Sequence, residues 1–302
     1  MQRFDWSDAK QKIGSVAVLV LLSMAARPAF AGATFPTAVD TAFGMPIPPR
    51  HAPFGVQASL YASIVFAAIG LIVLMVAIHD ARRTKTALPV FVALSGAFCA
   101  IPEIFIDIAG GCFWPYAEGH VVYTFLGRPM TWYPIFAWFG FGAVLAYVPY
   151  ALFLRRAKIS WLWIGLAITC AFDILVEEIM LNVPGLYVYY GQQPLILFTK
   201  FPAWWMFTNI PGVFFASALA WRFKDDLKGW RGLLMFALTP TAFLAVFGFA
   251  VMPASIVILG NYSWLTTQIG GLLTSILGLT ASALIIRIVL NRDPLALSER
   301  VG

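Results

Sequence analysis

Charged side chains are scarce in this sequence: Asp, Glu, Lys and Arg together make up 11% of its 302 residues. Soluble domains carry about 25% charged and about 45 to 50% apolar residues, whereas this chain is 61% hydrophobic. An ordinary soluble globular protein is therefore excluded. The formal charge of +6 does not indicate a nucleic-acid partner, because the basic residues occur in short clusters beside apolar runs and form no single patch.

Cysteine is also rare, and Cys99, Cys112 and Cys170 are far apart in the chain. They form no CxxC pair and no Cys/His ligand spacing, so the sequence contains no recognisable zinc site or disulfide framework. It also lacks a phosphate-binding loop, a dinucleotide fingerprint, a pair of haem ligands and a nucleophile triad. We therefore expect neither a metal nor a cofactor.

Long apolar runs are what the sequence has in abundance. Many reach the roughly 20 residues that a helix needs to cross a hydrocarbon core of about 30 Å. The runs are continuous rather than alternating, which favours helices over a membrane barrel. We predict an all-α, polytopic transmembrane helical bundle of about eight spans, at residues 13–31, 58–78, 87–109, 131–154, 159–181, 202–222, 232–253 and 264–287.

The distribution of basic residues predicts the orientation of these spans. With eight spans, 16 of the 20 Lys and Arg residues fall on one side, which the positive-inside rule places in the cytoplasm. Both termini are then cytoplasmic, and the protein is expected to be integral to the inner membrane. The segments near 32–57, 110–130, 182–201 and 254–263 are expected outside.

The chain divides into four parts on this basis. Residues 1–31 are either a first transmembrane span or a signal peptide, because Ala29-Phe30-Ala31 forms an Ala-x-Ala cleavage site. Cleavage would leave seven spans and unchanged orientation. A Pro-rich extracytoplasmic segment at 32–57 follows, then the transmembrane helical domain at 58–287 and a cytoplasmic tail at 288–302.

Acidic residues inside predicted spans are candidate functional groups, because they are costly in lipid. The third span holds Glu103 and Asp107, and the fifth holds Asp173, Glu177 and Glu178. A spacing of four residues places each of the first two pairs on one helical face. At 1.5 Å per residue, these acids lie about 21 Å or more from the cytoplasmic start of their helices, in the outer half of the membrane. Glu178 is offset from this face. We give equal weight to a place in the site and to a place at the membrane interface.

The segments after the two acidic helices resemble each other and predict an internal repeat of spans 3–4 and 5–6. Each runs from an acidic helix through an aromatic loop ending in Gly and Pro to a helix rich in aromatics. Both loops are expected to cover the acids from outside. The predicted substrate-binding residues, on these loops and at matching depth in the later spans, are Trp114, Tyr123, Arg128, Tyr189, Trp204, Trp205, Asn209 and Gln268.

Glu103, Asp107, Asp173 and Glu177 together have the equipment for general acid-base catalysis. Burial and a neighbouring carboxylate raise the pKa of one member of a carboxyl group pair, so a protonated acid and an ionised base can coexist near neutral pH. Aromatic walls suit an apolar substrate or a developing cation. We expect protonation, cyclisation, dehydration, hydration or isomerisation of a lipophilic polyketide or terpenoid, a small molecule that reaches the site from the membrane lipid.

The order of these motifs resembles the bacterial membrane proteins grouped with the AveC-type spirocyclases, which act in spiroketal polyketide biosynthesis. The resemblance covers most of residues 58–287. It depends on GGCFWP at 110–115, GRP at 127–129, YYGQQP at 189–194, and then Trp204, Trp205 and Asn209. The pattern of acids, aromatic loop and Trp is also similar in style to the membrane carotenoid hydratases. Both resemblances imply acid-base chemistry on a lipophilic molecule and leave the substrate open.

Two other functional classes stay open at this point. A proton-coupled transporter of a lipophilic solute would need polar groups through the full membrane thickness, and the cytoplasmic halves of these spans are almost purely apolar. A magnesium-dependent prenyltransferase resembling the UbiA superfamily would use Asp-rich helix ends to hold magnesium and diphosphate. Here the acid pairs contain Glu, and they are expected near the outer side of the membrane rather than at its cytoplasmic face.

Overall fold

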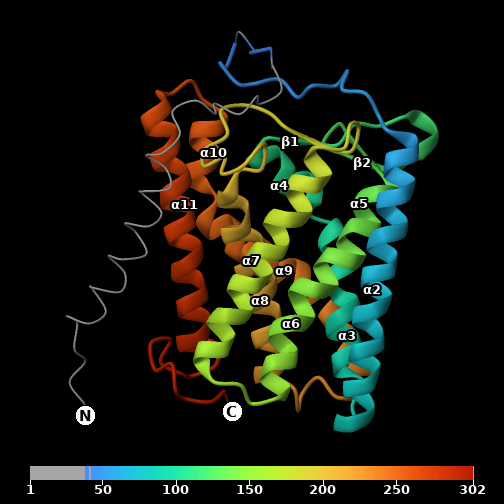
Figure 1. Ribbon diagram of the computed structural model, residues 1–302, viewed down its shortest axis with the longest axis vertical. Coiled ribbons are helices and arrows are strands. Elements are labelled where there is room, and N and C mark those ends of the chain that lie inside the picture. Colours follow the sequence, from blue (N-terminus) through green and yellow to red (C-terminus); the bar gives the residue numbers. More distant parts are fainter. Residues whose placement is uncertain (1–37, 41, 302) are drawn as a thin grey trace.

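The computed structural model describes residues 38–40 and 42–301, and they form a bundle of long, roughly parallel and antiparallel helices (Figure 1). The described residues contain five helices long and apolar enough to cross a membrane. They confirm a mostly helical protein with apolar helices of membrane-spanning length. Their bounds are Val56–Thr84 (α2), Trp132–Leu154 (α5, Trp132–Ala137, continuing into α6, Ala143–Leu154), Ile159–Leu181 (α7), Gly229–Ala250 (ending in α9, Met235–Ala250) and Trp264–Val289 (beginning with α11, Trp264–Leu284).

The third predicted span is broken rather than straight. Helix α3 (Leu88–Ser95) continues as a 3-10 turn to Ala100, and α4 (Glu103–Gly110) then leaves at an angle of 54°. Pro102 stands at the break. It has no amide hydrogen to continue the helical ladder, and its ring clashes with the preceding turn. The bend sets the direction of α4, which carries Glu103 and Asp107.

The sixth predicted span begins later than expected. Helix α8 covers Met206–Arg222, only 17 residues, after a 3-10 turn at Ala203–Trp205. Most of its side chains are buried, so α8 is a central helix packed against its neighbours. A helix enclosed by protein has little lipid-facing surface, and its length is set by those neighbours more than by the hydrocarbon core.

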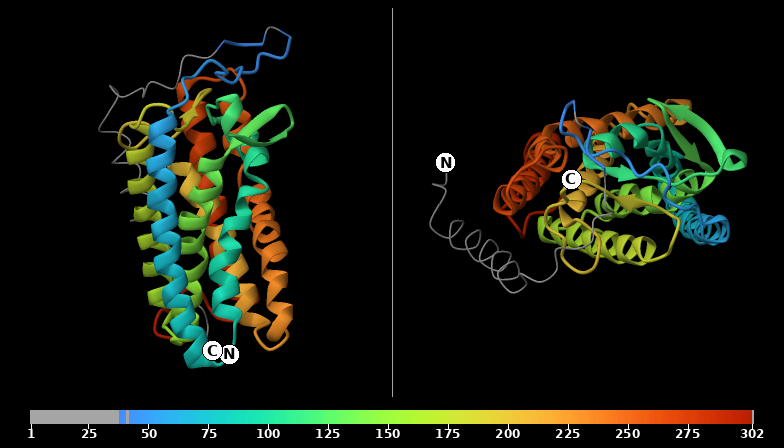
Figure 2. Two further views of the ribbon diagram at one scale, coloured as in Figure 1. Left: turned by 90° about the vertical axis from the view of Figure 1, so that its right-hand side faces the viewer. Right: turned by 90° about the horizontal axis from the view of Figure 1, so that it is seen from above.

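Short strands gather at one end of the bundle, which we call the strand end (Figure 2). Strand β1 (Cys112–Phe113) pairs antiparallel with β4 (Val188–Tyr189), so the two aromatic loops are joined. Strands β2 (Val121–Phe125) and β3 (Arg128–Thr131) form a hairpin. The short helix α10 (Met252–Ile258) packs against α11 and also contacts α4. These segments cover the ends of α4 and α7.

Most of the described Lys and Arg residues lie in or beside the connections at the opposite end, which we call the basic end. The predicted tail docks there: the amide of Ile159 donates to Glu299 O (2.8 Å), and that of Val301 donates to Ala157 O (2.9 Å). The first amides of a helix have no partner within the helix. The last residues of the chain therefore cap the start of α7.

Part of the predicted layout lies outside the described residues. This holds for the first span or signal peptide at 13–31 and for the beginning of the Pro-rich segment. The described part of that segment contains no helix before Val56, and it crosses the strand end (Figure 1). The total of eight spans, the internal repeat and the sidedness in the membrane stay predictions.

Candidate functional site

Three of the predicted catalytic acids line one cavity at the strand end. Glu103 and Asp107 project from α4, and Glu177 projects from α7. The cavity has a volume of about 50 Å³, and Glu103 and Asp107 are almost fully buried. The rest of its wall is mainly aromatic and apolar: Phe66, Ile106, Cys112, Trp114, Tyr133, Ala137, Trp138, Phe141, Val176, Met180, Tyr187, Tyr189, Trp205 and Asn209.

Two indole groups hold the carboxyls of α4. Trp138 Nε1 donates to Glu103 Oε2 at 2.7 Å, and Trp114 Nε1 donates to Asp107 Oδ2 at 2.8 Å. Trp114 lies on the loop after β1, and Trp138 lies where α5 passes into α6. An indole N–H can donate but cannot accept, so each bond fixes one carboxyl oxygen and leaves the other directed elsewhere.

Two phenols hold the carboxyl of α7. Tyr187 OH and Tyr189 OH both donate to Glu177 Oε2, at 2.7 and 3.1 Å. Burial, followed by the nearby Glu177 carboxyl, raises the pKa of both phenols well above their ordinary value of 10.0. The two hydroxyl groups therefore keep their protons and remain donors over the whole physiological pH range.

No described Lys, Arg or His side chain forms an ion pair with the cavity carboxyls. Arg128 is at the strand end, but its guanidinium donates to Cys112 O (2.8 Å) and to Tyr190 OH (2.5 Å). It thereby joins the β2–β3 hairpin to β1 and to Tyr190, the residue that follows β4. Every hydrogen bond to Glu103, Asp107 and Glu177 described above comes from a neutral donor.

Asp173 is the fourth predicted acid, and it is not on the cavity wall. It lies one helical turn before Glu177 on α7, with 0% of its surface exposed. Neither of its carboxyl oxygens has a hydrogen-bond partner among the described residues. Burying a carboxyl group without a partner costs free energy unless the group is protonated or forms a hydrogen bond with a water or with a side chain that moves to it.

The predicted substrate-binding residues separate into two groups. Trp114, Tyr189, Trp205 and Asn209 line the cavity. The others hold the surrounding segments together: Tyr123 OH donates to Ala100 O (2.8 Å), Trp204 Nε1 donates to Gln193 Oε1 (3.3 Å), Gln268 Oε1 accepts from Leu195 N (2.9 Å), and Arg128 makes the contacts given above.

Glu178 has a different role from its neighbour Glu177. Its carboxyl accepts the backbone N–H groups of Thr199 and Phe201, each at 3.1 Å. The side chain therefore orders the loop before α8, and it is absent from the cavity wall. Glu178 therefore lies outside the cavity, and its position at the membrane interface stays a prediction.

Sequence reasoning missed two of the donors, Trp138 and Tyr187, as site residues. Tyr187 could have been found, because it lies two residues before Tyr189 in an extended segment, where such residues share a face. Trp138 carried no local signal, since it is 35 residues from Glu103 in the chain. Only the packing of the α5–α6 helix, which contains Trp138, against the bent third span brings Trp138 and Glu103 together.

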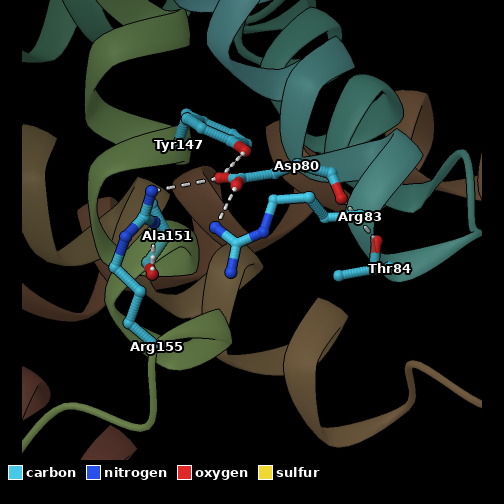
Figure 3. Close-up of polar contacts among 6 residues, drawn as sticks. All are labelled: Asp80, Arg83, Thr84, Tyr147, Ala151 and Arg155. Atoms are coloured by element: carbon cyan, nitrogen blue, oxygen red, sulfur yellow. Dashed lines mark hydrogen bonds and ion pairs between the residues drawn. The ribbon is translucent and has the colours of Figure 1, made fainter.

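Sequence reasoning also missed Asp80, a buried acid at the basic end (Figure 3). Its Oδ2 accepts from Tyr147 OH at 2.8 Å and lies 3.4 Å from a guanidinium nitrogen of Arg155. Its Oδ1 lies 3.6 Å from a guanidinium nitrogen of Arg83. Asp80 escaped notice because α2 continues to Thr84, beyond the predicted end of the second span at residue 78.

No family model, curated protein or solved structure matches the chain. The described residues also contain no group of three or more His, Cys, Asp or Glu side chains placed to hold a metal ion. The chemistry of the site therefore has to be inferred from its own carboxyls and donors. Three carboxyls on one small cavity, each held by a neutral N–H or O–H group, form an arrangement that can accept and release protons.

Proposed function

We propose that the protein is a membrane-embedded enzyme that uses Glu103, Asp107 and Glu177 for acid-base chemistry on a lipophilic molecule. Cyclisation, dehydration, hydration or isomerisation of a polyketide or terpenoid would each need one group that gives a proton and another that takes it. The convergence of three carboxyls from two helices on one cavity is the observation that supports this proposal.

The donors around the carboxyls support the same reaction type. A neutral N–H or O–H stabilises an ionised carboxylate without fixing it in that state, and it tolerates the protonated form through the other oxygen. The aromatic wall adds a low-dielectric surface that favours a developing cation. In this proposal one carboxyl acts as the acid and another as the base, and they exchange roles when the reaction reverses.

The size of the cavity restricts what part of the substrate it receives. At about 50 Å³, it is far below the roughly 300 to 1,000 Å³ of pockets that enclose drug-sized ligands. It suits a reacting functional group or a few waters. The body of the substrate would then lie along the apolar exterior of the bundle, or the strand-end loops would move to admit it.

We place the strand end on the extracytoplasmic side of the inner membrane, with the substrate reaching the site from the outer leaflet. The clustering of Lys and Arg at the basic end supports this orientation. Together with a first span at 13–31, the described helices would make up the eight predicted spans. The spirocyclase-like motifs on the β1 and β4 loops support a polyketide as the first substrate class to examine.

The proposal is tested by comparing the lipids of cells that lack the gene with those of cells complemented by the wild-type chain. We expect the wild type to change the mass or isomer pattern of one lipophilic compound. Glu177→Gln should abolish the change because an amide cannot transfer the proton, whereas Glu178→Gln, the matched control on the next residue, should retain it. Identical lipids with and without the wild-type chain would refute the enzyme.

Asp173 favours one second candidate, a proton-coupled transporter. A buried carboxyl without partners, one turn from the cavity along α7, is the kind of group that carries protons across a membrane protein. A transporter would produce no new compound. Purified chain in proteoliposomes would instead show a proton flux that Asp173→Asn abolishes. If a product formed only when magnesium was added, the result would instead support the magnesium-dependent prenyltransferase.

A further inference from the structure

The α8 side of the cavity carries two polar atoms without hydrogen-bond partners among the described residues, Trp205 Nε1 and Asn209 Oδ1. Both side chains line the cavity, and only 3% and 6% of their surfaces are exposed. A buried donor or acceptor left without a partner costs about 1 to 3 kcal/mol. Such a cost in the wall of a site indicates a group that a ligand satisfies.

The surrounding structure fixes the position of the Trp205 donor. The indole stacks on Trp204, with ring centroids 4.6 Å apart, and packs against Phe247 at 5.8 Å. It also lies over Gly110 of α4, where a Cβ atom would come within 2.1 Å of the ring. Any larger residue at position 110 would displace the indole. Its N–H is therefore held in one direction before a ligand arrives.

The spacing and chemistry of the two residues define what they can bind together. Trp205 ends the 3-10 turn that leads into α8, and Asn209 lies four residues later in the first turn of α8. This spacing places the two side chains on the same side of the helix start. An indole N–H only donates, and a carbonyl oxygen such as Asn209 Oδ1 only accepts. A single group that satisfies both must accept one hydrogen bond and donate another. A hydroxyl group or a water molecule does this, while a ketone can only accept and a hydrocarbon does neither.

We infer that Trp205 and Asn209 bind the hydroxyl oxygen of the substrate, or the water that becomes it, so the reaction eliminates or adds water. This inference rests on the proposed function and narrows it, because an isomerisation moves no oxygen. The carboxyls of α4 and α7 line the same cavity as Trp205 and Asn209, so a carbon that bears the bound hydroxyl group would share the cavity with them.

The elimination balances with the groups present. A carboxylic acid of the cavity gives its proton to the hydroxyl oxygen, the C–O bond breaks, and the oxygen leaves as water with the bonding electron pair. A second carboxyl, ionised, takes the proton from the adjacent carbon, and the electrons of that C–H bond form the new C=C bond. The alcohol becomes an alkene and one water, and a proton passing between the carboxyls restores the starting state. Hydration is the reverse.

The test uses membranes that contain the full chain, incubated with a lipid extract from cells lacking the gene in water enriched in heavy oxygen. We expect a compound that forms only with the wild type and differs from its precursor by the mass of one water. In the hydration direction the new hydroxyl group carries the heavy oxygen. In the elimination direction, the heavy oxygen exchanges into the remaining alcohol through the reverse reaction.

Variants then assign the oxygen site. Trp205→Phe keeps an aromatic ring and removes only the N–H, and Asn209→Leu removes the amide. Each should lower the rate roughly tenfold to hundredfold, the equivalent of one lost partner for a buried polar group. Trp163→Phe is the matched control, because it also removes an indole hydrogen bond, here to Pro294 O near the basic end, and it should keep the wild-type rate.

The outcomes separate this inference from the proposed function. A product with the same mass as its precursor overturns the water chemistry and leaves an acid-base isomerase. A product heavier by one water whose new hydroxyl group lacks the heavy oxygen overturns it as well. Wild-type rates in folded Trp205→Phe and Asn209→Leu proteins overturn the assignment to α8. The absence of any product with the wild type overturns the enzyme itself. The labelling of the wild type decides the reaction even where a variant fails to fold.

Discussion

Buried acids occur at both ends of this bundle, but their partners differ. At the basic end, Asp80 faces two guanidinium groups, from Arg83 and Arg155, together with the hydroxyl of Tyr147 (Figure 3). At the strand end, three carboxyls share a cavity with indole and phenol donors and form no described ion pair. One acid is neutralised by cations, and the others are held by neutral groups.

The difference explains why only one of the two clusters is a candidate for chemistry. The Asp80 carboxylate forms ion pairs with two guanidiniums, so its charge is part of the contacts between these helices. A carboxyl group that is held only by neutral donors loses no ion pair when it takes up a proton. The same residue type therefore ties helices together at the basic end and is free to exchange protons at the strand end.

The largest expected effect is on the reaction rate. Asp107→Asn and Glu177→Gln should each lower the rate by about 10² to 10⁴, the usual contribution of general acid-base catalysis. Both proteins should fold, because a neutral amide is cheaper to bury than an unpaired charge. Single-turnover rates in membranes would measure this effect. Asp80→Asn is the comparison, and a comparable loss of rate in its folded form would remove the distinction between the two ends.

The second expected effect is on stability and belongs to Asp80. Asp80→Ala removes the acceptor of Tyr147 OH and the charge shared by two guanidiniums. We expect a loss of about 1 to 3 kcal/mol of unfolding free energy, the cost of a buried polar group without its partner. Denaturant unfolding of the detergent-solubilised protein would measure it.

Asp225→Ala provides the matched control for Asp80→Ala. It breaks the ion pair of Asp225 with Lys228 (2.8 Å), in which both side chains are exposed. Exposed ion pairs contribute little, so the unfolding midpoint should stay unchanged. Equal losses in the two variants would mean that burial does not distinguish the two ion pairs.

The helices and the acid positions were predictable because they depend on local pattern. Apolar runs predicted most bounds of the long helices to within a few residues, but α2 continues six residues beyond the predicted end at residue 78. The four-residue spacing placed Glu103 and Asp107 on one face. The bend at Pro102 was missed although proline is a local signal, because the apolar run of the third span continues through it. The short α8 was not predicted, since its length depends on which helices lie in the centre. The partners of the acids were the least predictable, because Tyr147 and Arg155 are 67 and 75 residues from Asp80 in the chain.

The third expected effect concerns Arg128, a cation at the strand end that forms no ion pair with the cavity acids, in contrast to the arginines around Asp80. Arg128→Gln should loosen the strand-end loops, because the shorter side chain cannot keep its bonds to both Cys112 O and Tyr190 OH. We expect faster hydrogen exchange at the amide of Tyr190, which donates to Gly111 O at 2.7 Å, with the helices unaffected. Unchanged exchange at Tyr190 would show that Arg128 does not hold the loops, and exchange that rises throughout the bundle would show general destabilisation.

The smallest effect is electrostatic, and it tests whether the acids at the strand end carry charge. Burial, then the nearby Glu103 and Asp107 carboxyls, raise the pKa of Tyr123 from 10.0 to about 12. A phenol whose pKa is higher in the folded state contributes stability below pH 10 that is lost as the pH rises towards 12. Tyr123→Phe should therefore make the unfolding temperature fall less steeply between these pH values.

The pH dependence of the unfolding temperature, measured again in Asp107→Asn, distinguishes the acids at the strand end from Asp80 at the basic end. Removing a charge beside Tyr123 lowers the pKa of its phenol, so the loss of stability between pH 10 and 12 should become smaller. Asp80→Asn should leave the Tyr123-dependent part of the profile unchanged, because Asp80 lies at the basic end and is not among the groups that shift this phenol. If Asp107→Asn has no effect on that part, Asp107 carries no charge that Tyr123 senses, and the ionised base of the reaction must be sought in Glu103 or Glu177.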